Sequence, residues 1–514
     1  MRPLLYFITA AIAATSAPLF AQTMLVAPYV QPGDGATLAG ADVKSLIWFT
    51  DQTPGEFTVE YGIAGTPPRK AIATRTALNF PLPKKKPAPT PAPAANPGAD
   101  APTTLEDLKK EVAASSSVPF AEKEQHYFRY VADLAGLPFD STVSYRVKMG
   151  GDLVREGAFK TRASAGKTIR FVAVGDLATG KPQQNGVAWQ IAQQKPDFMI
   201  ALGDIVYSAG RAGQYMHHFF PTYNDVPKPG PQTGAPIMAS VPIYPVIGNH
   251  DIEVARISAF PDAWGAFYFF RVPHSGPGPG AWSPVPSKDG KITADFQNLA
   301  GAEFPAMLNY SWDDGPAHFM ALDCGAHVKG DEAGLLAWIE HDLQASKQPW
   351  KIVCFHAPAF HTSREHYTQQ KMRTLEPLFE RCGVDLVLNG HVHNYQRSKP
   401  LRFQPAGPRD KRGRQDGELT LDETFDGVKD TTPEGIIHVV SGGGGASLYS
   451  QDFPKTVAYL QKEHGANYTP LTANYYAAKH SFSVVDITPT IFKLRQIAIS
   501  GEEVDAMTIT KPAR

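Results

Sequence analysis

Five segments of the sequence carry side chains that can bind metal ions. They are Gly175-Asp176, Gly203-Asp204, Asn249-His250-Asp251, His356 and His391-Val392-His393. Carboxylate oxygens, imidazole nitrogens and an amide oxygen together form a set of metal ligands. The segments contain neither a Ser or Cys nucleophile elbow nor a phosphate-binding glycine loop. The residue types therefore predict a metal site.

Each segment directly follows an apolar stretch that is typical of a buried strand. Open α/β sheets bind ligands beyond the carboxyl ends of their strands, so we expect these side chains to converge at one edge. Taken alone, a Gly-Asp pair is often a turn, and a single histidine such as His356 is more often a core or surface residue. His391 and His393 are more specific, because both rings can face one side of an extended chain. The same arrangement at five strand ends is hard to explain as accident.

Residues 167–511 alternate apolar strands with segments of helical spacing, which predicts an α/β domain around buried sheets. Strands are expected at 168–176, 197–204, 243–251, 317–323, 350–356, 384–391 and 436–443. Helices are expected at 186–194, 332–343 and 370–382. Long Gly- and Pro-rich stretches near 227–236, 273–286 and 405–433 are interpreted as functional rims or mobile insertions.

Residues 24–163 favour a small all-β sandwich instead. Segments rich in β-branched and aromatic residues, with mostly alternating polarity, occur at 45–50, 56–62, 126–134, 142–150 and 156–161. Gly, Pro and Asp separate them, as in turns. The Pro- and Ala-rich segment 81–102 is expected to be an extended, mobile insertion between strands.

The N-terminus has the features of a secretory signal peptide. Met1–Ala21 holds one basic residue, Arg2, then an apolar run over 4–14 and small residues before Gln22. The run is shorter than the roughly 18 apolar residues of a membrane span. We therefore expect cleavage after Ala21 and a periplasmic or secreted protein without a membrane span; the alternative is an unprocessed buried segment.

Composition limits the partners and the redox chemistry. The chain has 514 residues, enough for at least two domains, and a formal net charge of -1. No overall positive field exists to attract nucleic acid or anionic lipid, so an anion-binding site needs local positive charge. Cys324, Cys354 and Cys382 follow apolar runs and are expected to be buried thiols, with one internal bridge as the alternative.

Four of the metal-binding segments resemble sequence blocks of the purple acid phosphatases, within the calcineurin-like metallophosphoesterases. They are Gly203-Asp204-Ile205-Val206-Tyr207, Gly248-Asn249-His250-Asp251, Val353-Cys354-Phe355-His356 and Gly390-His391-Val392-His393. The fifth block, Gly175-Asp176-Leu177-Ala178, departs from the family at Ala178, where glycine is usual. The resemblance implies a fibronectin type III-like N-terminal domain followed by a metallophosphoesterase domain layered as an α/β/β/α sandwich.

The resemblance also implies a role for each residue of the site. A ferric ion would be held by Asp176, Tyr207 and His393. A divalent ion, Fe, Zn or Mn, would be held by Asn249, His356 and His391, with Asp204 bridging the two metals. His250 and His366 would be the catalytic, substrate-facing histidines, with His361 as the alternative to His366.

Elementary chemistry agrees with this ligand set. A phenol with an ordinary pKa near 10 binds well only to a strongly Lewis-acidic ion, which favours a trivalent metal at Tyr207. Two aspartates and a phenolate carry three negative charges against five on a trivalent–divalent pair. About two positive charges remain, which suits a phosphate dianion.

The function expected from these residues is that of an exported acid phosphatase acting on small phosphomonoesters. A metal-bound hydroxide would attack phosphorus, and His250 would protonate the leaving alkoxide. Two alternatives remain open. One is a phosphodiesterase or nucleotidase with the same two metals, and the other is a non-catalytic exported binding protein.

Overall fold

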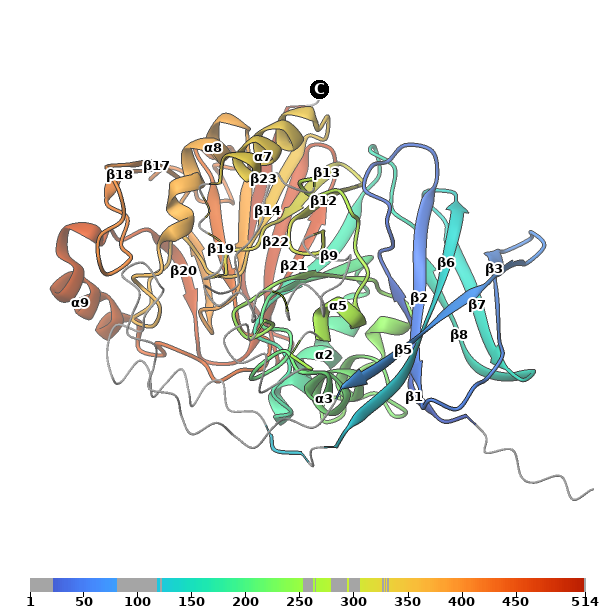
Figure 1. Cartoon of the computed structure of the whole chain (residues 1–514). Coiled ribbons are helices and arrows are strands. Elements are labelled where there is room, and N and C mark those ends of the chain that lie inside the picture. Colours follow the sequence, from blue (N-terminus) through green and yellow to red (C-terminus); the bar gives the residue numbers. More distant parts are fainter. Residues whose placement is uncertain are drawn as a thin grey trace, which may run out of the picture.

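The computed structural model of the protein describes residues 22–80, 118–120, 123–252, 262–263, 265–278, 294, 306–325, 328, 330 and 332–512. The expected signal peptide at 1–21 and the Pro- and Ala-rich insertion at 81–102 lie outside the described residues. Figure 1 shows a β-rich N-terminal part on the right and a larger part on the left in which helices flank sheets. None of the helices in the described residues is long and apolar enough to cross a membrane.

The N-terminal part is a sandwich of two antiparallel four-stranded sheets, with strand orders β1-β2-β6-β5 and β4-β3-β7-β8. Its strands are β1 (Met24–Gln31), β2 (Asp42–Thr50), β3 (Phe57–Ile63), β4 (Arg69–Ala71), β5 (Ala73–Phe80), β6 (Gln125–Leu137), β7 (Thr142–Met149) and β8 (Asp152–Lys160). Alternate residues of β7 are buried, as expected for a strand with one face on a core. Between the sheets, the Trp48 and Phe57 rings pack with centroids 5.0 Å apart.

The C-terminal part contains two larger sheets. A six-stranded sheet has the order β11-β10-β9-β21-β22-β23, and a seven-stranded sheet has the order β12-β13-β14-β15-β19-β16-β20. The strands of the first are β9 (Ile169–Val174), β10 (Phe198–Leu202), β11 (Ile243–Val246), β21 (Ser481–Ile487), β22 (Ile491–Ala498) and β23 (Glu503–Thr510). Those of the second are β12 (Tyr310–Asp314), β13 (Ala317–Ala321), β14 (Trp350–Cys354), β15 (Leu386–Asn389), β16 (Tyr395–Ser398), β19 (Ile437–Ser441) and β20 (Thr472–Tyr476).

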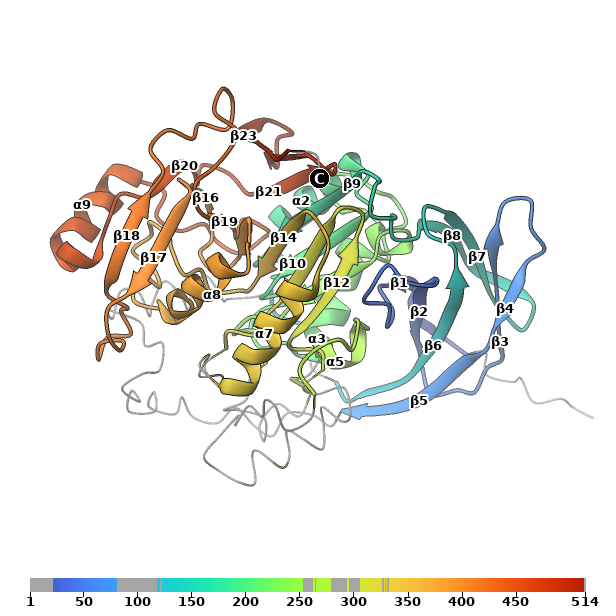
Figure 2. The same cartoon turned by 90° about the horizontal axis from the view of Figure 1, so that it is seen from above.

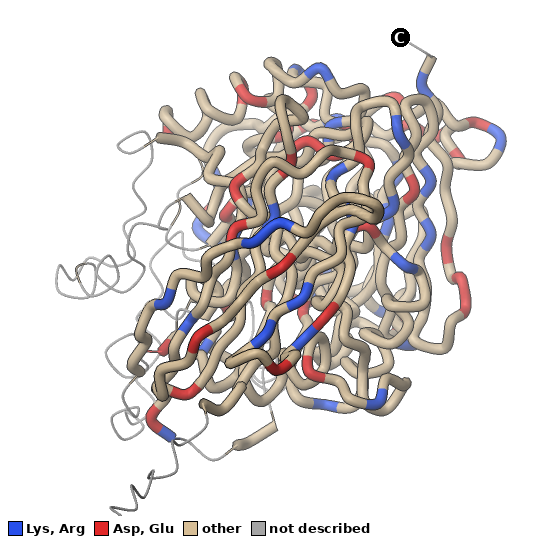
Figure 3. The backbone as a smooth tube through the Cα atoms, turned by 90° about the vertical axis from the view of Figure 1, so that its right-hand side faces the viewer, with Lys and Arg blue, Asp and Glu red and all other residues tan. Residues whose placement is uncertain are grey.

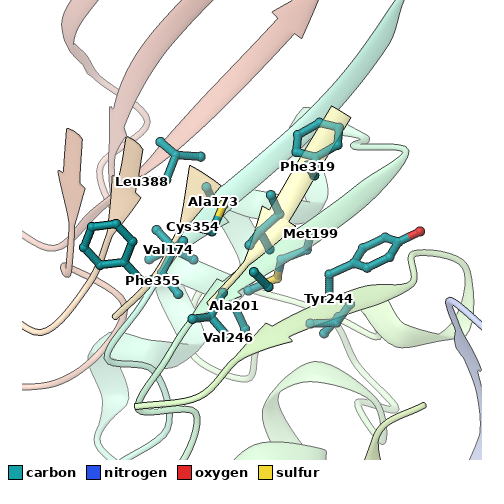
Figure 4. Close-up of a cluster of buried hydrophobic side chains, with 14 of the residues drawn as sticks. Ala173, Val174, Met199, Ala201, Tyr244, Val246, Phe319, Cys354, Phe355 and Leu388 are labelled. Atoms are coloured by element: carbon teal, nitrogen blue, oxygen red, sulfur yellow. The ribbon is translucent and has the colours of Figure 1, made fainter. Parts of the chain in front are cut away.

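The two large sheets pack face to face through apolar side chains. Phe171 and Phe198 of the first sheet meet Phe319 of the second, with centroid distances of 5.3 and 5.4 Å. Figure 4 shows further side chains of this core, including Met199 from one sheet and Leu388 from the other. Continuous burial along strands such as β10 and β11 explains why their sequences lack the alternation of the N-terminal strands.

Helices cover the outer faces of the sheets. α2 (Pro182–Gln194) contacts β21 of the six-stranded sheet, whereas α7 (Ala333–Ala345) lies along the seven-stranded sheet (Figure 2). Further helical segments of the described residues are α3 (Ala212–Gln214), η1 (Tyr215–Phe219), α4 (Phe220–Tyr223), η2 (Ile237–Ala239), α5 (Gly265–Phe269), η5 (Lys371–Leu375), α8 (Glu376–Arg381), α9 (Phe453–His464) and η6 (Gly465–Asn467). This confirms the α/β/β/α layering that the resemblance implies.

Two local features differ from the sequence-based expectation. The helix expected at 370–382 is divided into η5 and α8, because Pro377 lacks an amide hydrogen and its ring excludes a regular helical turn before it. The expected loop at 405–433 contains β18 (Gly417–Leu421), which pairs with β17 (Leu401–Pro405). The three cysteines are buried and form no disulfide.

The sandwich is joined to the larger part by buried polar contacts. Arg162 binds Asp42 of the sandwich over 2.8 Å and donates to the Asp313 carbonyl over 3.1 Å. The backbone of Val118, at the end of the β5–β6 connection, donates to Thr179 over 2.7 Å, close to the turn after β9. Charges of both signs are interspersed over the face shown in Figure 3, in keeping with the balanced composition.

Candidate metal centre

The predicted ligands follow neighbouring strand ends of the two sheets. Asp176 and Asp204 come two positions after β9 and β10, which are parallel neighbours. His356 and His391 come two positions after β14 and β15, which are also parallel neighbours. Because the carboxyl ends of parallel strands share an edge, these four side chains are brought together.

The backbone turns sharply at these strand ends. Asp176, Asp204 and His391 have positive φ angles of 62°, 51° and 66°. This left-handed conformation is uncommon outside glycine and concentrates at functional sites. Gly248 allows a close approach to Asp204, because a Cβ at this position would lie 2.2 Å from Asp204 Oδ1.

One half of the centre surrounds the Tyr207 hydroxyl. This group donates to Asp176 Oδ1 over 2.9 Å and lies 3.1 Å from Asp204 Oδ2 and 3.2 Å from His393 Nε2. His393 Nε2 is itself 3.2 Å from Asp176 Oδ1. All four side chains are buried. Four ligand-type atoms thus face one another in a space that the protein shields from water.

The other half of the centre surrounds the second carboxylate oxygen of Asp204, Oδ1. Asp204 Oδ1 is 3.2 Å from His356 Nε2, and ligand atoms of Asp204, His356 and His391 lie within 4.8 Å of one another. Asp204 is therefore the residue common to both halves, with one carboxylate oxygen toward each. This is the position that a bridging carboxylate requires.

The nitrogen of each histidine that points away from the centre is hydrogen-bonded. Nδ1 of His356, His393 and His250 bonds to a backbone carbonyl over 2.7, 2.8 and 2.8 Å: those of Leu202, Ser447 and Ser208. In His391 the two ring nitrogens exchange these roles, because Nε2 is the one that bonds to a protein oxygen, Gln369 Oε1. Such contacts fix the tautomer and leave the other nitrogen with a lone pair for a metal ion.

The residues fit a pair of metal ions. His356 Nε2 is buried without a hydrogen-bond partner among the described residues, although Asp204 Oδ1 is close, as expected for two ligands of one cation. Burial, together with Asp176 and Asp204, raises the pKa of Tyr207 well above its ordinary value. The phenol therefore loses its proton only to a strongly Lewis-acidic ion. Burial and neighbouring histidines lower the pKa of His391, which keeps this ring neutral and able to bind metal.

Asn249 is the member of the predicted ligand set that the structure leaves exposed. Its neighbours nevertheless adjoin the centre, because the His250 amide donates to Asp204 Oδ1 over 2.8 Å. Asp251 fixes this loop by accepting hydrogen bonds from Gly248 and Ile205, each over 2.8 Å. Burial, and then the Asp204 carboxylate, raise the pKa of Asp251 to about 7.

The substrate-facing candidates occupy different surroundings. His250 is partly exposed, with its Nε2 3.9 Å from Asp204 Oδ2. The His366 ring lies 4.0 Å from the His391 ring and is also partly exposed. His361 is buried next to Tyr367, and its two ring nitrogens have no hydrogen-bond partner among the described residues. The structure thus brings His366, and not His361, against the predicted ligand His391.

Sequence reasoning missed residues that support the ligands from outside the strand ends. The Tyr449 ring stacks on His393 with centroids 4.0 Å apart at an angle of 10°. Gln369 and the Ser447 carbonyl orient His391 and His393. The run Gly442–Gly445 after β19 was the one available signal, because glycines there admit close backbone approach to Asp176 and Leu177.

Comparisons with known proteins agree with the fold. Residues 169–395 match the model of the family described as calcineurin-like phosphoesterase. An uncharacterized protein of Mycobacterium tuberculosis is 25% identical over 342 residues, which cover 62% of this chain and 58% of that protein. Purple acid phosphatase 15 of Arabidopsis thaliana is 24% identical over 264 residues, 46% of this chain and 43% of that one. Other Arabidopsis relatives are named probable inactive purple acid phosphatases.

Among solved structures, a purple acid phosphatase from yellow lupin seeds shares the fold. Its TM-score is 0.57 at 18% identity, covering 94% of this chain and 74% of that one. Residues 169–395 are therefore a calcineurin-like phosphoesterase domain. The resemblance to the purple acid phosphatases is confirmed by the sequence relatives and by the shared two-domain fold. The matched segment spans 58% of the mycobacterial relative.

Proposed function

We propose that the protein is a dinuclear-metal phosphatase that hydrolyses phosphomonoesters. The observation that carries this proposal is the position of Asp204. One of its carboxylate oxygens faces Tyr207, and the other faces His356. A carboxylate placed in this way, between two groups of ligand atoms, is what a pair of metal ions requires.

The two halves of the site would hold different ions. Asp176, Tyr207 and His393 suit Fe(III), because the phenolate and the carboxylate are hard, negatively charged ligands. His356 and His391 suit a divalent Fe, Zn or Mn, with Asn249 as the further ligand offered by the loop that His250 holds on Asp204. When bound, such a pair activates water and polarises the phosphoryl oxygens.

The side chains of the chain itself provide charge and proton transfer. Asp176, Asp204 and Tyr207 supply three negative charges, and the histidines stay neutral as ligands, so a trivalent–divalent pair keeps about two positive charges for the substrate. His250 donates through Nδ1 to the Ser208 carbonyl, which leaves Nε2 on the side of Asp204. From there it can protonate the leaving oxygen, and His366 can hold the phosphoryl group beside His391.

Export is part of the proposal and rests on Met1–Ala21 alone. The mature chain is then expected to begin at Gln22 in the periplasm or the medium. N-terminal sequencing of protein recovered outside the cytoplasm tests this, and a chain that retains Met1 would contradict it.

The test of the function combines metal quantification with turnover. Protein purified without chelators is expected to contain two metal ions per chain and to hydrolyse phenyl phosphate faster than diphenyl phosphate. Faster hydrolysis of the diester would favour the phosphodiesterase alternative. An empty site with no turnover after addition of iron and zinc would favour a non-catalytic binding protein.

A further inference from the structure

A cavity of about 360 Å³ adjoins the metal centre. It is formed by two loops, one before His366 and one after β19, and by the first turn of α9. Its lining includes Arg364, Glu365, Ser447, Tyr449, Asp452 and Thr456. This volume lies in the range of cavities that bind small molecules.

The cavity and the metal centre share a wall. Ser447 accepts the hydrogen bond of His393 Nδ1, and the Tyr449 amide donates to the His393 carbonyl over 2.9 Å. The Tyr449 ring stacks on His393, and its centroid is 5.8 Å from that of His366. A group in the cavity is therefore next to the site where the phosphoryl group would bind.

Arg364 is the cation of this cavity that lacks a carboxylate partner among the described residues. Its guanidinium lies 4.5 Å from the centroid of the Tyr459 ring, and its Nε atom is buried with no hydrogen-bond partner in the described part of the chain. The other lining cation, Lys455, is paired with Asp452 over 2.8 Å. Glu365 accepts a hydrogen bond from Ser450. A guanidinium with unused donors is suited to a carboxylate or phosphate group.

We propose that this cavity binds the leaving group of the substrate and that Arg364 selects phosphoesters whose leaving group carries a second anionic group. The inference rests on the proposed function, because it takes the phosphoryl group to lie at the metal centre. Tyr449 supplies an aromatic wall for the body of the leaving group, and Arg364 supplies the charge beyond it.

The inference is tested on the metal-loaded full chain in two separate measurements, the binding of phosphonates and the turnover of phosphate esters. Phenylphosphonate and 4-carboxyphenylphosphonate differ by one carboxylate, and their C–P bond is not hydrolysed. Calorimetric titration is expected to show at least about tenfold tighter binding of the carboxylated compound to the wild type. Phenyl phosphate and 4-carboxyphenyl phosphate are expected to show the same ratio in kcat/KM.

Substitutions of Arg364 test whether this residue causes the preference for the carboxylated phosphonate. Arg364→Gln is expected to reduce the ratio between the two phosphonates about tenfold, and Arg364→Lys is expected to retain part of it. Lys462→Gln removes the same charge from α9 outside the cavity and is expected to keep the wild-type ratio. A wild-type ratio near one, or an unchanged ratio in Arg364→Gln, overturns the inference. A phosphonate preference without turnover of either phosphate supports the cavity assignment but overturns the proposed function.

Discussion

Tyr207 and Asp176 come from consecutive parallel strand ends, and the Tyr207 hydroxyl donates a hydrogen bond to Asp176 Oδ1 over 2.9 Å. Both side chains are fully buried. The two oxygens are therefore placed for one shared cation, and in its absence they share a proton.

Tyr207 is expected to give the iron-loaded protein its colour. A phenolate bound to Fe(III) gives the protein a visible absorption band, so Tyr207→Phe is expected to abolish the band and to lower the iron content. Tyr449→Phe is the matched control, because it removes a neighbouring hydroxyl and keeps the ring that stacks on His393. Visible spectra with metal quantification provide the measurement. A coloured wild type with an equally coloured Tyr207→Phe protein would show that the ligand assignment is wrong.

A second prediction tests whether Asp204 bridges the two metal ions while Asp176 binds only one of them. Asp204→Asn removes the negative charge that faces both halves of the metal centre. This variant is expected to lose both metal ions. Asp176→Asn affects the half around Tyr207 and is expected to leave the divalent ion bound. Metal content of the two variants, measured after identical purification, distinguishes these outcomes. Equal loss of both ions in the two variants would argue against Asp204 as the bridge.

His250 is expected to act on the leaving group. His250→Ala should lower kcat on an alkyl phosphate about a hundredfold or more, with unchanged metal content. The loss should be smaller for 4-nitrophenyl phosphate, because this leaving group departs without protonation. Steady-state kinetics on both substrates tests the role. An identical loss on the two substrates would mean that His250 contributes something other than a proton.

Gln369 is expected to position His391 for the divalent ion. Gln369→Leu removes the acceptor of His391 Nε2 and is expected to weaken binding of the divalent ion about 10- to 100-fold, without change in the visible band. Gln369→Glu keeps an acceptor and should restore most of the affinity. Titration of the metal-depleted variants with zinc measures the effect, and wild-type affinity in Gln369→Leu would remove this residue from the site.

The sequence was most informative for polar residues that directly follow a buried strand. Asp176, Asp204, His356 and His391 follow continuous apolar strands, so the parallel sheet alone brings them together. Tyr449 and Gln369 lie in loops, where no periodicity relates sequence position to a place in space. Their contacts with His393 and His391 depend on how loops from distant parts of the chain pack, which local patterns do not specify.

The choice between His361 and His366 illustrates the same limit. Both follow His356 in one irregular segment. What separates them is a positive φ of 62° at His366, which turns the chain so that its ring meets His391. A backbone angle of this kind at a non-glycine residue has no signature in the sequence.

The last prediction concerns stability away from the metal centre. His318 of β13 bonds to Asp313 over 2.8 Å and to Asp342 of α7 over 2.9 Å, and so ties this helix to the sheet. Burial lowers the pKa of His318, but the two aspartates outweigh this effect and raise the pKa to about 9. The folded protein therefore holds the proton more tightly than the unfolded chain, whose histidines titrate near 6.5.

The stabilisation by His318 is then complete below about pH 6.5 and disappears as the pH rises through about 9, a change of about 3 kcal/mol. Because tyrosines and lysines also titrate at high pH, the informative quantity is the difference between the wild type and His318→Gln. The wild type should unfold at a higher urea concentration at pH 6, and the two midpoints should converge by pH 10. A difference that stays constant from pH 6 to pH 10 would mean that the ion pairs on His318 do not stabilise the fold, and that its ring acts through packing alone.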